Sequence, residues 1–383
     1  MTAPLDPIDL YAWFDTLTPA EDARRRAVRA VLERDIAPVA DAHWEAGTFY
    51  HGALTGFHAT DPLAHWFTDG DGAAGRTMAD GLLSLELARV DPSLASYFGV
   101  HGGLCFGSIA LLAEWLPALR RFARLGAFGL TEPEVGSGVA RGLTTTCRRD
   151  GDAWVLEGEK KWIGNATFAD VVVIWARDVG DGSVKGFLVR TTTPGYAARL
   201  MTGKIAQRAL ASGWITLTGC RVPEADRLPG ARSFADTARV LSGARIGVAF
   251  QAVGCAMGAY EHALRYATTR VQFDRPIAGF QLVQSMLVKM AGNVTAMLGM
   301  ALRAARLQDA GRSNDALTAL AKQFCAAHCR ETVQLARELM GGNGVLLEHG
   351  AARLFCDAEA IYSYEGTNEV TSLVVGRALT GIG

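Results

Sequence analysis

Glu365 is the residue in this sequence best placed to do acid–base chemistry. It stands in Tyr364-Glu365-Gly366-Thr367, between the apolar run Ala360 to Tyr364 and a predicted helix from Asn368 to Leu379. Most single glutamates are solvated surface charges, but flanking apolar residues could bury this one and raise its pKa toward that of a usable base. The segment therefore predicts a carboxylate held in a tight turn.

Two glycine-containing segments favour a bound cofactor. Thr131-Glu132-Pro133 is followed by Gly136-Ser137-Gly138, so backbone N–H groups and two hydroxyls could approach a polar ring edge or a phosphate. Lys160 to Asn165 places Trp162 beside flexible backbone. A third break, Gly341-Gly342-Asn343-Gly344, ends a predicted long helix.

Two other cofactor hypotheses are disfavoured by spacing. The run Gly136 to Arg141 nearly matches a dinucleotide fingerprint, but Arg141 stands where the third glycine should be, and Thr144 to Thr146 follow where a helix is required. Cys325, His328 and Cys329 share one helix face but lack a second ligand pair at a suitable spacing. We expect neither a Rossmann domain nor a metal site.

Composition narrows the class of protein further. At roughly 100 to 200 residues per domain, 383 residues predict two or three domains. A net charge of -1 gives no overall electrostatic field that would attract nucleic acid. Seven scattered cysteines favour a reducing, cytoplasmic location. The apolar stretch Ile246 to Tyr260 contains Gln251 and is shorter than the roughly 20 residues of a membrane span, so it predicts a buried small-residue helix. Neither a secretory signal nor a Ser-Lys-Leu address is present.

The order of predicted elements is helices, sheet, helices, which is an α+β chain that is mainly α. A capping box at Thr18 to Glu21 starts a helix to about Ala42, a loop follows from Thr68 to Gly75, and helical patterns resume from Ala79 to Arg124. Strands are predicted at 153–156, 171–176, 186–189 and 214–218, and helices at 235–268, 277–310, 317–340 and 368–379. The predicted domains are 1–125, 126–230 and 231–383.

Five ordered motifs resemble the acyl-CoA dehydrogenase family over nearly the whole chain. They are Phe128 to Ser137, Trp162, Arg270-Val-Gln-Phe273, Gly341 to Gly344 and Tyr364 to Thr367. Trp162-Ile-Gly-Asn165, Arg337 to Gly342 and Ile361 to Glu365 are most similar to the branch of glutaryl-CoA dehydrogenases and plant short-chain acyl-CoA oxidases. The resemblance implies an N-terminal helical domain, a central β-barrel-like domain and a C-terminal four-helix bundle, assembled around FAD as a homotetramer or a homodimer.

The resemblance also implies a reaction. Forming an α,β-double bond in an acyl thioester removes a weakly acidic α-proton while a hydride leaves the β-carbon, and FAD accepts the hydride. Glu365 matches the family's catalytic base. In the family, the thioester carbonyl is polarised by the N–H of this glutamate and by a flavin hydroxyl.

Further residues are assigned only through the resemblance. The positions that match flavin contacts are Phe128, Leu130, Thr131, Ser137, Trp162, Gly164 and Thr367. The positions through which neighbouring subunits hold the adenine and pyrophosphate ends of FAD are Arg270, Phe273, Gln281, Glu338 and Gly342. Positions near the acyl-CoA are Ser137, Arg245, Tyr364 and Gly366. The alternative interpretation of Arg270 and Gln281 is that they are ordinary polar residues on a helix surface.

Departures from the family pattern leave the substrate and the electron acceptor open. Gly164 stands where many dehydrogenases have a threonine beside the flavin, and the plant oxidases share this glycine, so the acceptor is an electron-transfer flavoprotein or O2. Ala95 stands where glutaryl-CoA dehydrogenase has an arginine for the distal carboxylate, which disfavours a dicarboxylic substrate. We expect a short-chain or branched acyl-CoA, with a thioester on a carrier protein as the alternative. Retention of Glu365 argues against a flavin monooxygenase.

Overall fold

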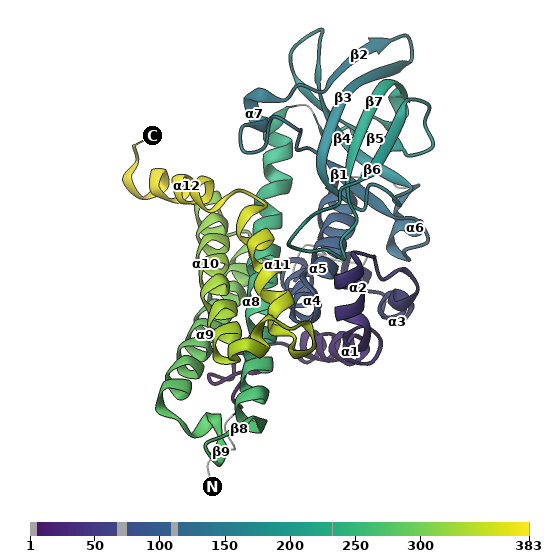
Figure 1. The fold of residues 1–383 in the computed structure, drawn as a ribbon. Coiled ribbons are helices and arrows are strands. Elements are labelled where there is room, and N and C mark those ends of the chain that lie inside the picture. The colour runs from purple at the N-terminus through teal and green to yellow at the C-terminus, as the bar shows by residue number, and fades with distance from the viewer. Residues whose placement is uncertain (1–5, 67–74, 109–113, 232, 383) are drawn as a thin grey trace. The chain divides into compact units, whose positions relative to one another are not determined.

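The computed structural model describes residues 6–66, 75–108, 114–231 and 233–382 (Figure 1). These residues form two compact units. The first comprises the described residues of Met1–Ala95, Ile205–Ala209 and Arg245–Gly383, and the second those of Ser96–Lys204 and Leu210–Ala244. The first unit is helical, and the second contains the large β-sheet.

The N-terminal helices of the first unit begin at the expected capping box. In α1 (Pro19–Asp35), the Thr18 side chain accepts a hydrogen bond from the Glu21 N–H, and the Glu21 carboxylate accepts one from the Thr18 N–H. The helix ends at Asp35 rather than near Ala42, because Pro38 has no N–H to donate and its ring obstructs the preceding turn. A 3₁₀ turn then leads into α2 (Ala40–Ala46).

The helical pattern predicted as far as Arg124 is divided into shorter pieces than expected, and those beyond Ala95 belong to the second unit. After α3 (Thr55–Ala59) come α4 (Arg76–Val90), α5 (Pro92–Phe98), a π-helical segment (Gly99–Phe106) and α6 (Leu116–Arg120). The loop predicted from Thr68 to Gly75 lies, apart from Gly75, outside the described residues.

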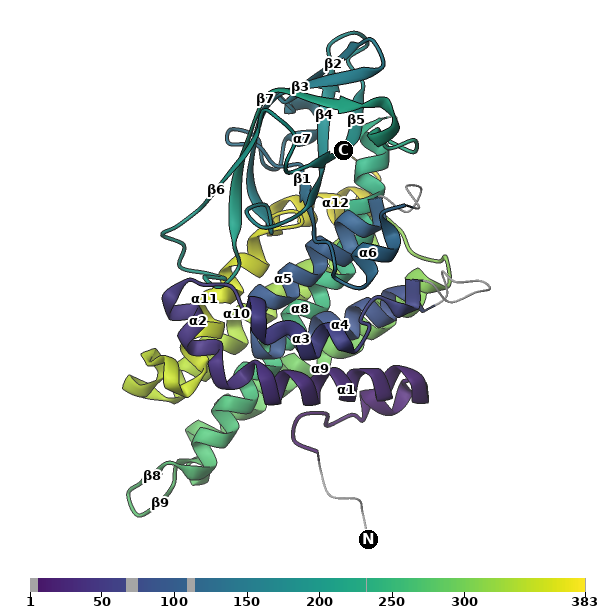
Figure 2. The same cartoon turned by 90° about the vertical axis from the view of Figure 1, so that its right-hand side faces the viewer.

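The C-terminal part is the predicted helical bundle with one additional helix. It comprises α8 (Phe234–Thr269), α9 (Gln281–Asp309), α10 (Asp315–Leu339), α11 (Ala351–Ser363) and α12 (Asn368–Thr380). Helix α10 packs against α9, α11 and α12 (Figures 1 and 2). Helix α11 was not predicted: its buried positions Leu354, Ala358 and Ile361 repeat at helical spacing but are interrupted by buried Arg353 and Asp357.

Small residues bring α8 close to α4. A Cβ atom at Gly254 would collide with the backbone carbonyl of Leu85, and one at Gly258 with that of Arg89. By length and apolar composition alone, α8 and α9 could cross a membrane, but 61% and 50% of their apolar windows are buried inside the protein. This burial is what the core helices of a bundle show.

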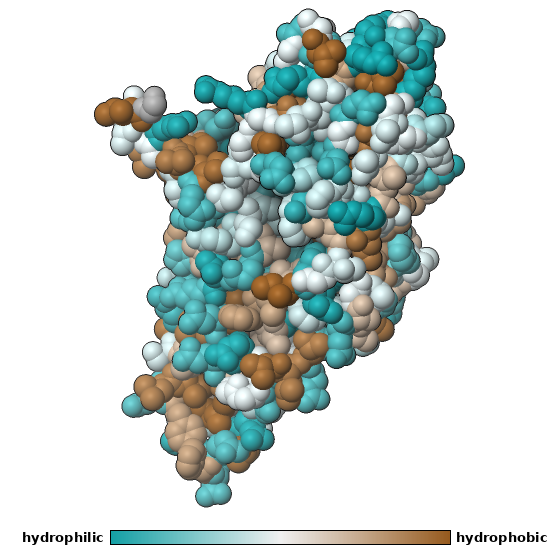
Figure 3. All heavy atoms as spheres, turned by 45° about the horizontal axis from the view of Figure 1, so that its top comes forward, coloured by the Kyte–Doolittle hydropathy of each residue, from teal (hydrophilic) through white to brown (hydrophobic). Residues whose placement is uncertain are grey.

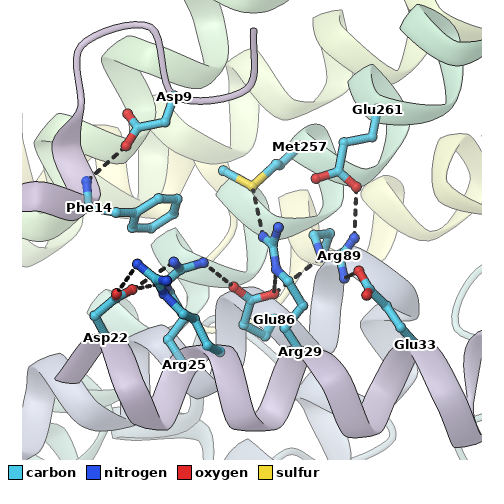
Figure 4. A network of polar contacts seen from close by, with 11 residues as sticks. Asp9, Phe14, Asp22, Arg25, Arg29, Glu33, Glu86, Arg89, Met257 and Glu261 are labelled. Carbon is cyan, nitrogen blue, oxygen red and sulfur yellow. Dashed lines mark hydrogen bonds and ion pairs between the residues drawn. The ribbon is translucent and has the colours of Figure 1, made fainter. Parts of the chain in front are cut away.

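A buried charge network joins α1, α4 and α8 (Figure 4). The fully buried Glu86 side chain accepts hydrogen bonds from Arg25 (3.1 Å), Arg29 (2.8 Å) and Arg89 (3.2 Å). Arg89 also donates to Glu33 at 2.6 Å and to Glu261 at 2.7 Å. Burial disfavours the charge of Arg89, but Glu261 and Glu86 raise the pKa of its guanidinium above the ordinary value.

The second unit is built on one curled seven-stranded sheet with the strand order β1-β4-β2-β3-β7-β6, and β5 pairs with β4. The strands are β1 (Gly126–Gly129), β2 (Thr146–Asp150), β3 (Ala153–Gly164), β4 (Val171–Asp178), β5 (Val184–Arg190), β6 (Tyr196–Leu200) and β7 (Ser212–Pro223). The four predicted strands are confirmed within β3, β4, β5 and β7, whereas β1, β2 and β6 were missed because each has only four or five residues. Bulges in β3 bend it beside Gly158 and Lys160.

The network around Glu86 predicts an unequal effect of two substitutions. Glu86→Ala leaves the three arginines without their shared buried carboxylate and should lower the free energy of unfolding by about 3 to 5 kcal/mol. Arg34→Ala removes an ion pair whose arginine is 67% exposed and should cost less than about 1 kcal/mol. Urea titration measures both, and equal losses would contradict a structural role for Glu86.

Candidate active site

Glu365 lies in a strained turn between α11 and α12. Its backbone has a φ of 54°, in the left-handed region, and Gly366 follows with a φ of 94°. A non-glycine residue in this region costs about 1 kcal/mol, so the surrounding contacts must hold it there. The turn passes directly into α12, whose first N–H groups are capped by Thr367, since its side chain accepts a hydrogen bond from Val370 N–H.

The Glu365 carboxyl is shielded from water and is close to two cations. Burial raises its pKa to about 7, while the charges of Arg245 and Lys322 act in the opposite direction. Its Oε2 atom is buried and has no hydrogen-bond partner among the described residues. A carboxyl with a pKa near neutrality and an unused oxygen is suited to accept a proton from a bound molecule.

Arg245, on α8, offers unused donors in the same region. Its side chain is only 15% exposed, and Nη1 lies 3.7 Å from Asp315 Oδ1. Neither Nε nor Nη1 has a hydrogen-bond partner within the described part of the chain. Buried guanidinium groups are normally satisfied, so these donors indicate a place for an additional acceptor.

Tyr364 is tied into a chain of neutral amides. Its hydroxyl donates to Gln251 Oε1 at 2.5 Å and accepts from Gln207 Nε2 at 3.1 Å. Gln251 Nε2 in turn donates to the carbonyl of Ala95 at 3.3 Å. The first unit thus brings together Arg245, Tyr364, Glu365, Gly366 and Thr367.

The second unit brings the candidate residues of β1 and β3 together. Phe128 and Leu130 are buried and Thr131 is half-buried, and the Lys161 N–H donates to the carbonyl of Thr131 at 2.8 Å. Trp162 follows Lys161 with a left-handed φ of 65° and a side chain that is 57% exposed. The backbone therefore holds Thr131 next to the residue that precedes Trp162.

A buried ion pair supports this arrangement. Lys160 Nζ donates to Glu132 Oε1 at 2.9 Å and to the carbonyl of Leu130 at 3.2 Å. Glu132 also accepts from the N–H groups of Thr144 and Thr145. Burial acts to raise the pKa of Glu132, but Lys160 and the threonines lower it to about 2. Lys160 and Glu132 thus fix the segment that carries Thr131, although no role was predicted for either residue.

Two other positions of the second unit differ in exposure. Ser137 is exposed and precedes α7 (Val139–Gly142), a single turn and too short for a dinucleotide-binding helix. Gly164 is buried, and a Cβ atom there would lie 3.2 Å from Val100 Cγ2. A larger residue at this position would need Val100 to move.

A third set of candidates lies away from Glu365 within the helical unit. Arg270, Phe273, Gln281, Glu338 and Gly342 are all exposed, Phe273 to 86%. Helix α9 begins at Gln281 and at 29 residues spans about 43 Å before α10 begins. Lys322, near the start of α10, contacts the Glu365 turn, so the exposed set lies toward the opposite end of the bundle (Figure 1).

The cysteines show ordinary packing. Cys325 and Cys329 are buried in the bundle, and the His328 ring is hydrogen-bonded to the Phe324 carbonyl at 2.9 Å. No group of three potential metal ligands occurs among the residues that the structure describes.

Sequence comparison with known families and proteins accounts for nearly the whole chain. Residues 18–122, 127–220 and 234–380 match the N-terminal, middle and C-terminal domains of acyl-CoA dehydrogenases. The probable acyl-CoA dehydrogenase FadE25 of Mycobacterium tuberculosis is 31% identical over 375 residues, covering 95% of this chain and 96% of the relative.

Solved structures agree with this relationship. Two structures of glutaryl-CoA dehydrogenase from Mycobacterium smegmatis, the second in complex with FADH2, are 36% and 32% identical with TM-scores of 0.92 and 0.93, and each covers 99% of both chains. Butyryl-CoA dehydrogenase from Megasphaera elsdenii is 27% identical with a TM-score of 0.90, covering 95% of this chain and 99% of its own. The chain belongs to the acyl-CoA dehydrogenase family and is an FAD-dependent oxidoreductase.

Proposed function

We propose that this enzyme converts a short-chain or branched acyl-CoA, not a dicarboxylic one, to the trans-2-enoyl-CoA, with Glu365 as the base and an electron-transfer flavoprotein as the acceptor. The observation that carries the proposal is the buried, unpartnered Oε2 atom of Glu365, on a carboxyl whose pKa is about 7. Arg245 adds unused donors in the same region.

The residues present fit a bound flavin. Trp162 exposes an aromatic ring next to the segment of Thr131, and Ser137 exposes a hydroxyl. FAD, when bound, supplies the hydride acceptor that no side chain can provide. The residues of the second unit that would hold it are Phe128, Leu130, Thr131, Ser137, Trp162 and Gly164. Thr367 keeps the flavin contact that the resemblance to the family implies.

The chain's own contribution to the reaction is proton transfer and polarisation. Glu365 Oε2 takes the α-proton of the thioester, and the low polarity around the carboxyl keeps its pKa close to the operating pH. The backbone N–H of Glu365 makes no hydrogen bond among the described residues, so it is available to the thioester carbonyl. Gly366 allows the positive φ of 94° that follows Glu365, and Arg245 and Tyr364 border the acyl-CoA.

Neutral surroundings favour an uncharged acyl chain. Ala95 is fully buried, and its carbonyl is bonded to Gln251 rather than to a cation. The hydroxyl of Tyr364 contacts the amides of Gln251 and Gln207. Ala95 itself offers a distal carboxylate no charged partner, so we assign a non-dicarboxylic substrate although several relatives are glutaryl-CoA dehydrogenases.

The exposed residues at the far end of the bundle support an oligomer, which we propose to be a homotetramer or a homodimer. Arg270, Phe273 and Gln281 are too distant along the bundle to serve the flavin at Glu365 of their own chain. Apolar side chains gather at this end of the bundle and along α12 (Figure 3); they include Val271, Phe273, Leu282, Val345, Leu346, Leu373 and Leu379. Glu338 and Gly342 complete the surface that would hold a neighbour's FAD.

The second candidate acceptor is O2, which would yield hydrogen peroxide. Gly164 favours it, because Val100 crowds the space that a threonine side chain would occupy.

The proposal also includes domain boundaries at residues 125 and 230 and a cytoplasmic location.

Anaerobic titration with a panel of acyl-CoAs tests the substrate. We expect one class of short or branched saturated acyl-CoA to bleach the flavin and glutaryl-CoA to leave it oxidised. Admission of air then separates the two acceptors, because an oxidase recovers its colour at once and releases peroxide. Failure of every CoA ester on a fully flavinated protein would refute the proposed substrate.

Replacement of the base tests its role directly. Glu365→Gln should lower the rate of flavin reduction by about 10² to 10⁴, since general-base catalysis typically contributes that much. Glu348→Gln, at an exposed glutamate outside the site, should retain the parental rate. Stopped-flow spectroscopy measures both, and an undiminished rate in Glu365→Gln would remove this residue from the mechanism.

The raised pKa of Glu365 also predicts a pH-dependent stability. Because the folded-state pKa is about 7 and the ordinary value is 4.5, the group favours folding below about pH 4.5, and this contribution is lost as the pH rises through 7. Glu365→Gln should match the parent near pH 5 and exceed it by roughly 1 to 3 kcal/mol at pH 8. Thermal melts of the substrate-free proteins at both pH values measure this, and an equal difference at each pH would contradict it.

A further inference from the structure

Lys322 is a fully buried lysine for which the proposed reaction has no direct use. It lies on α10 with a side chain that is 0% exposed, among the buried residues Ala319, Ala321 and Cys325. Burial lowers the pKa of its ammonium group to about 8, against the opposing influence of Glu365 and Glu369. Burying a charged ammonium group costs free energy, so Lys322 is expected to have specific hydrogen-bond partners.

The partners of Lys322 are the two ends of the Glu365 turn. Its Nζ donates to the carbonyl of Tyr362 at 2.8 Å and to that of Gly366 at 2.7 Å. These carbonyls stand three residues before and one residue after Glu365. One ammonium group therefore spans the segment in which Glu365 and Gly366 adopt positive φ angles.

We propose that Lys322 is a positioning residue for Glu365, holding the strained turn by its two hydrogen bonds and placing a positive charge next to it. This inference rests on the proposed role of Glu365 as the base. The turn has no helical hydrogen bonds of its own at Glu365, so the clamp on Tyr362 and Gly366 compensates for the cost of the left-handed backbone.

The charge has a separate consequence for the pH dependence. Glu365 is faced by Arg245 from α8 and Lys322 from α10, while Asp315 of α10 pairs with Arg245 and Glu369 of α12 acts on Lys322. Both cations favour the ionised carboxylate against the burial that raises its pKa. Removing the Lys322 charge should therefore raise the pKa of Glu365 further.

Three substitutions separate the clamp from the charge. Lys322→Met removes both, Lys322→Gln removes the charge but keeps one donor group, and Lys322→Arg keeps the charge. Lys289→Met, at a lysine that is 56% exposed on α9, is the control. Each protein is compared as the FAD-loaded enzyme by absorbance and thermal melting before use.

The decisive measurement isolates proton abstraction from oxidation. The flavin is first reduced with dithionite, and exchange of the α-hydrogens of butyryl-CoA in D2O is followed by mass spectrometry as a function of pH. We expect the rise of the exchange rate to shift upward by about one pH unit in Lys322→Met and Lys322→Gln. The profile should not shift in Lys322→Arg or Lys289→Met.

A folded, flavinated Lys322→Gln or Lys322→Met enzyme with the parental profile would overturn the inference. If Lys322→Met fails to fold, Lys322→Gln decides. A loss of exchange at all pH values without a shift would also overturn the role of the charge. Undiminished exchange in Glu365→Gln would instead show that the proposed base is wrong, so the two failures are distinguishable.

Discussion

The close approach of α8 to α4 is the constraint on which the helical unit depends. Gly254 and Gly258 allow backbone contact with Leu85 and Arg89, where any side chain would push the helices apart. The same two helices carry Glu86, Arg89 and Glu261, so their separation sets the geometry of the buried charge network (Figure 4). Close packing and charge pairing therefore support each other here.

Helix α8 also connects this packing with the candidate site. Arg245 and Gln251 precede Gly254 on the same helix, and Gln251 bonds to Tyr364 beside the proposed base. A displacement of α8 would move these side chains together. The close packing of α4 and α8 thus helps to fix the positions of Arg245 and Gln251, which lie up to several helical turns before Gly254.

The candidate site combines strain, burial and charge at one residue. Glu365 has a left-handed backbone, a shielded carboxyl oxygen and two nearby cations. Burial alone would favour a permanently protonated acid, and cations in an open site would favour a permanent carboxylate. The balance between burial and the two cations leaves the pKa of Glu365 near neutral pH, where a base can both take and release a proton.

The sequence by itself determined the identity of the motifs, the order of helices, sheet and helices, and the buried small-residue character of Ile246 to Tyr260. These features are local, because capping residues, apolar periodicity and glycine turns act over a few residues. The tertiary structure alone decided that Lys322 reaches the turn of Glu365 and that Lys160 pairs with Glu132. It also determined that α11 exists despite Arg353 and Asp357 on its buried face. The end of α1 at Asp35, by contrast, follows from Pro38, a local signal that the prediction overlooked. Partners distant in the chain and the loss of water around a charge depend on packing in three dimensions, which no local pattern records.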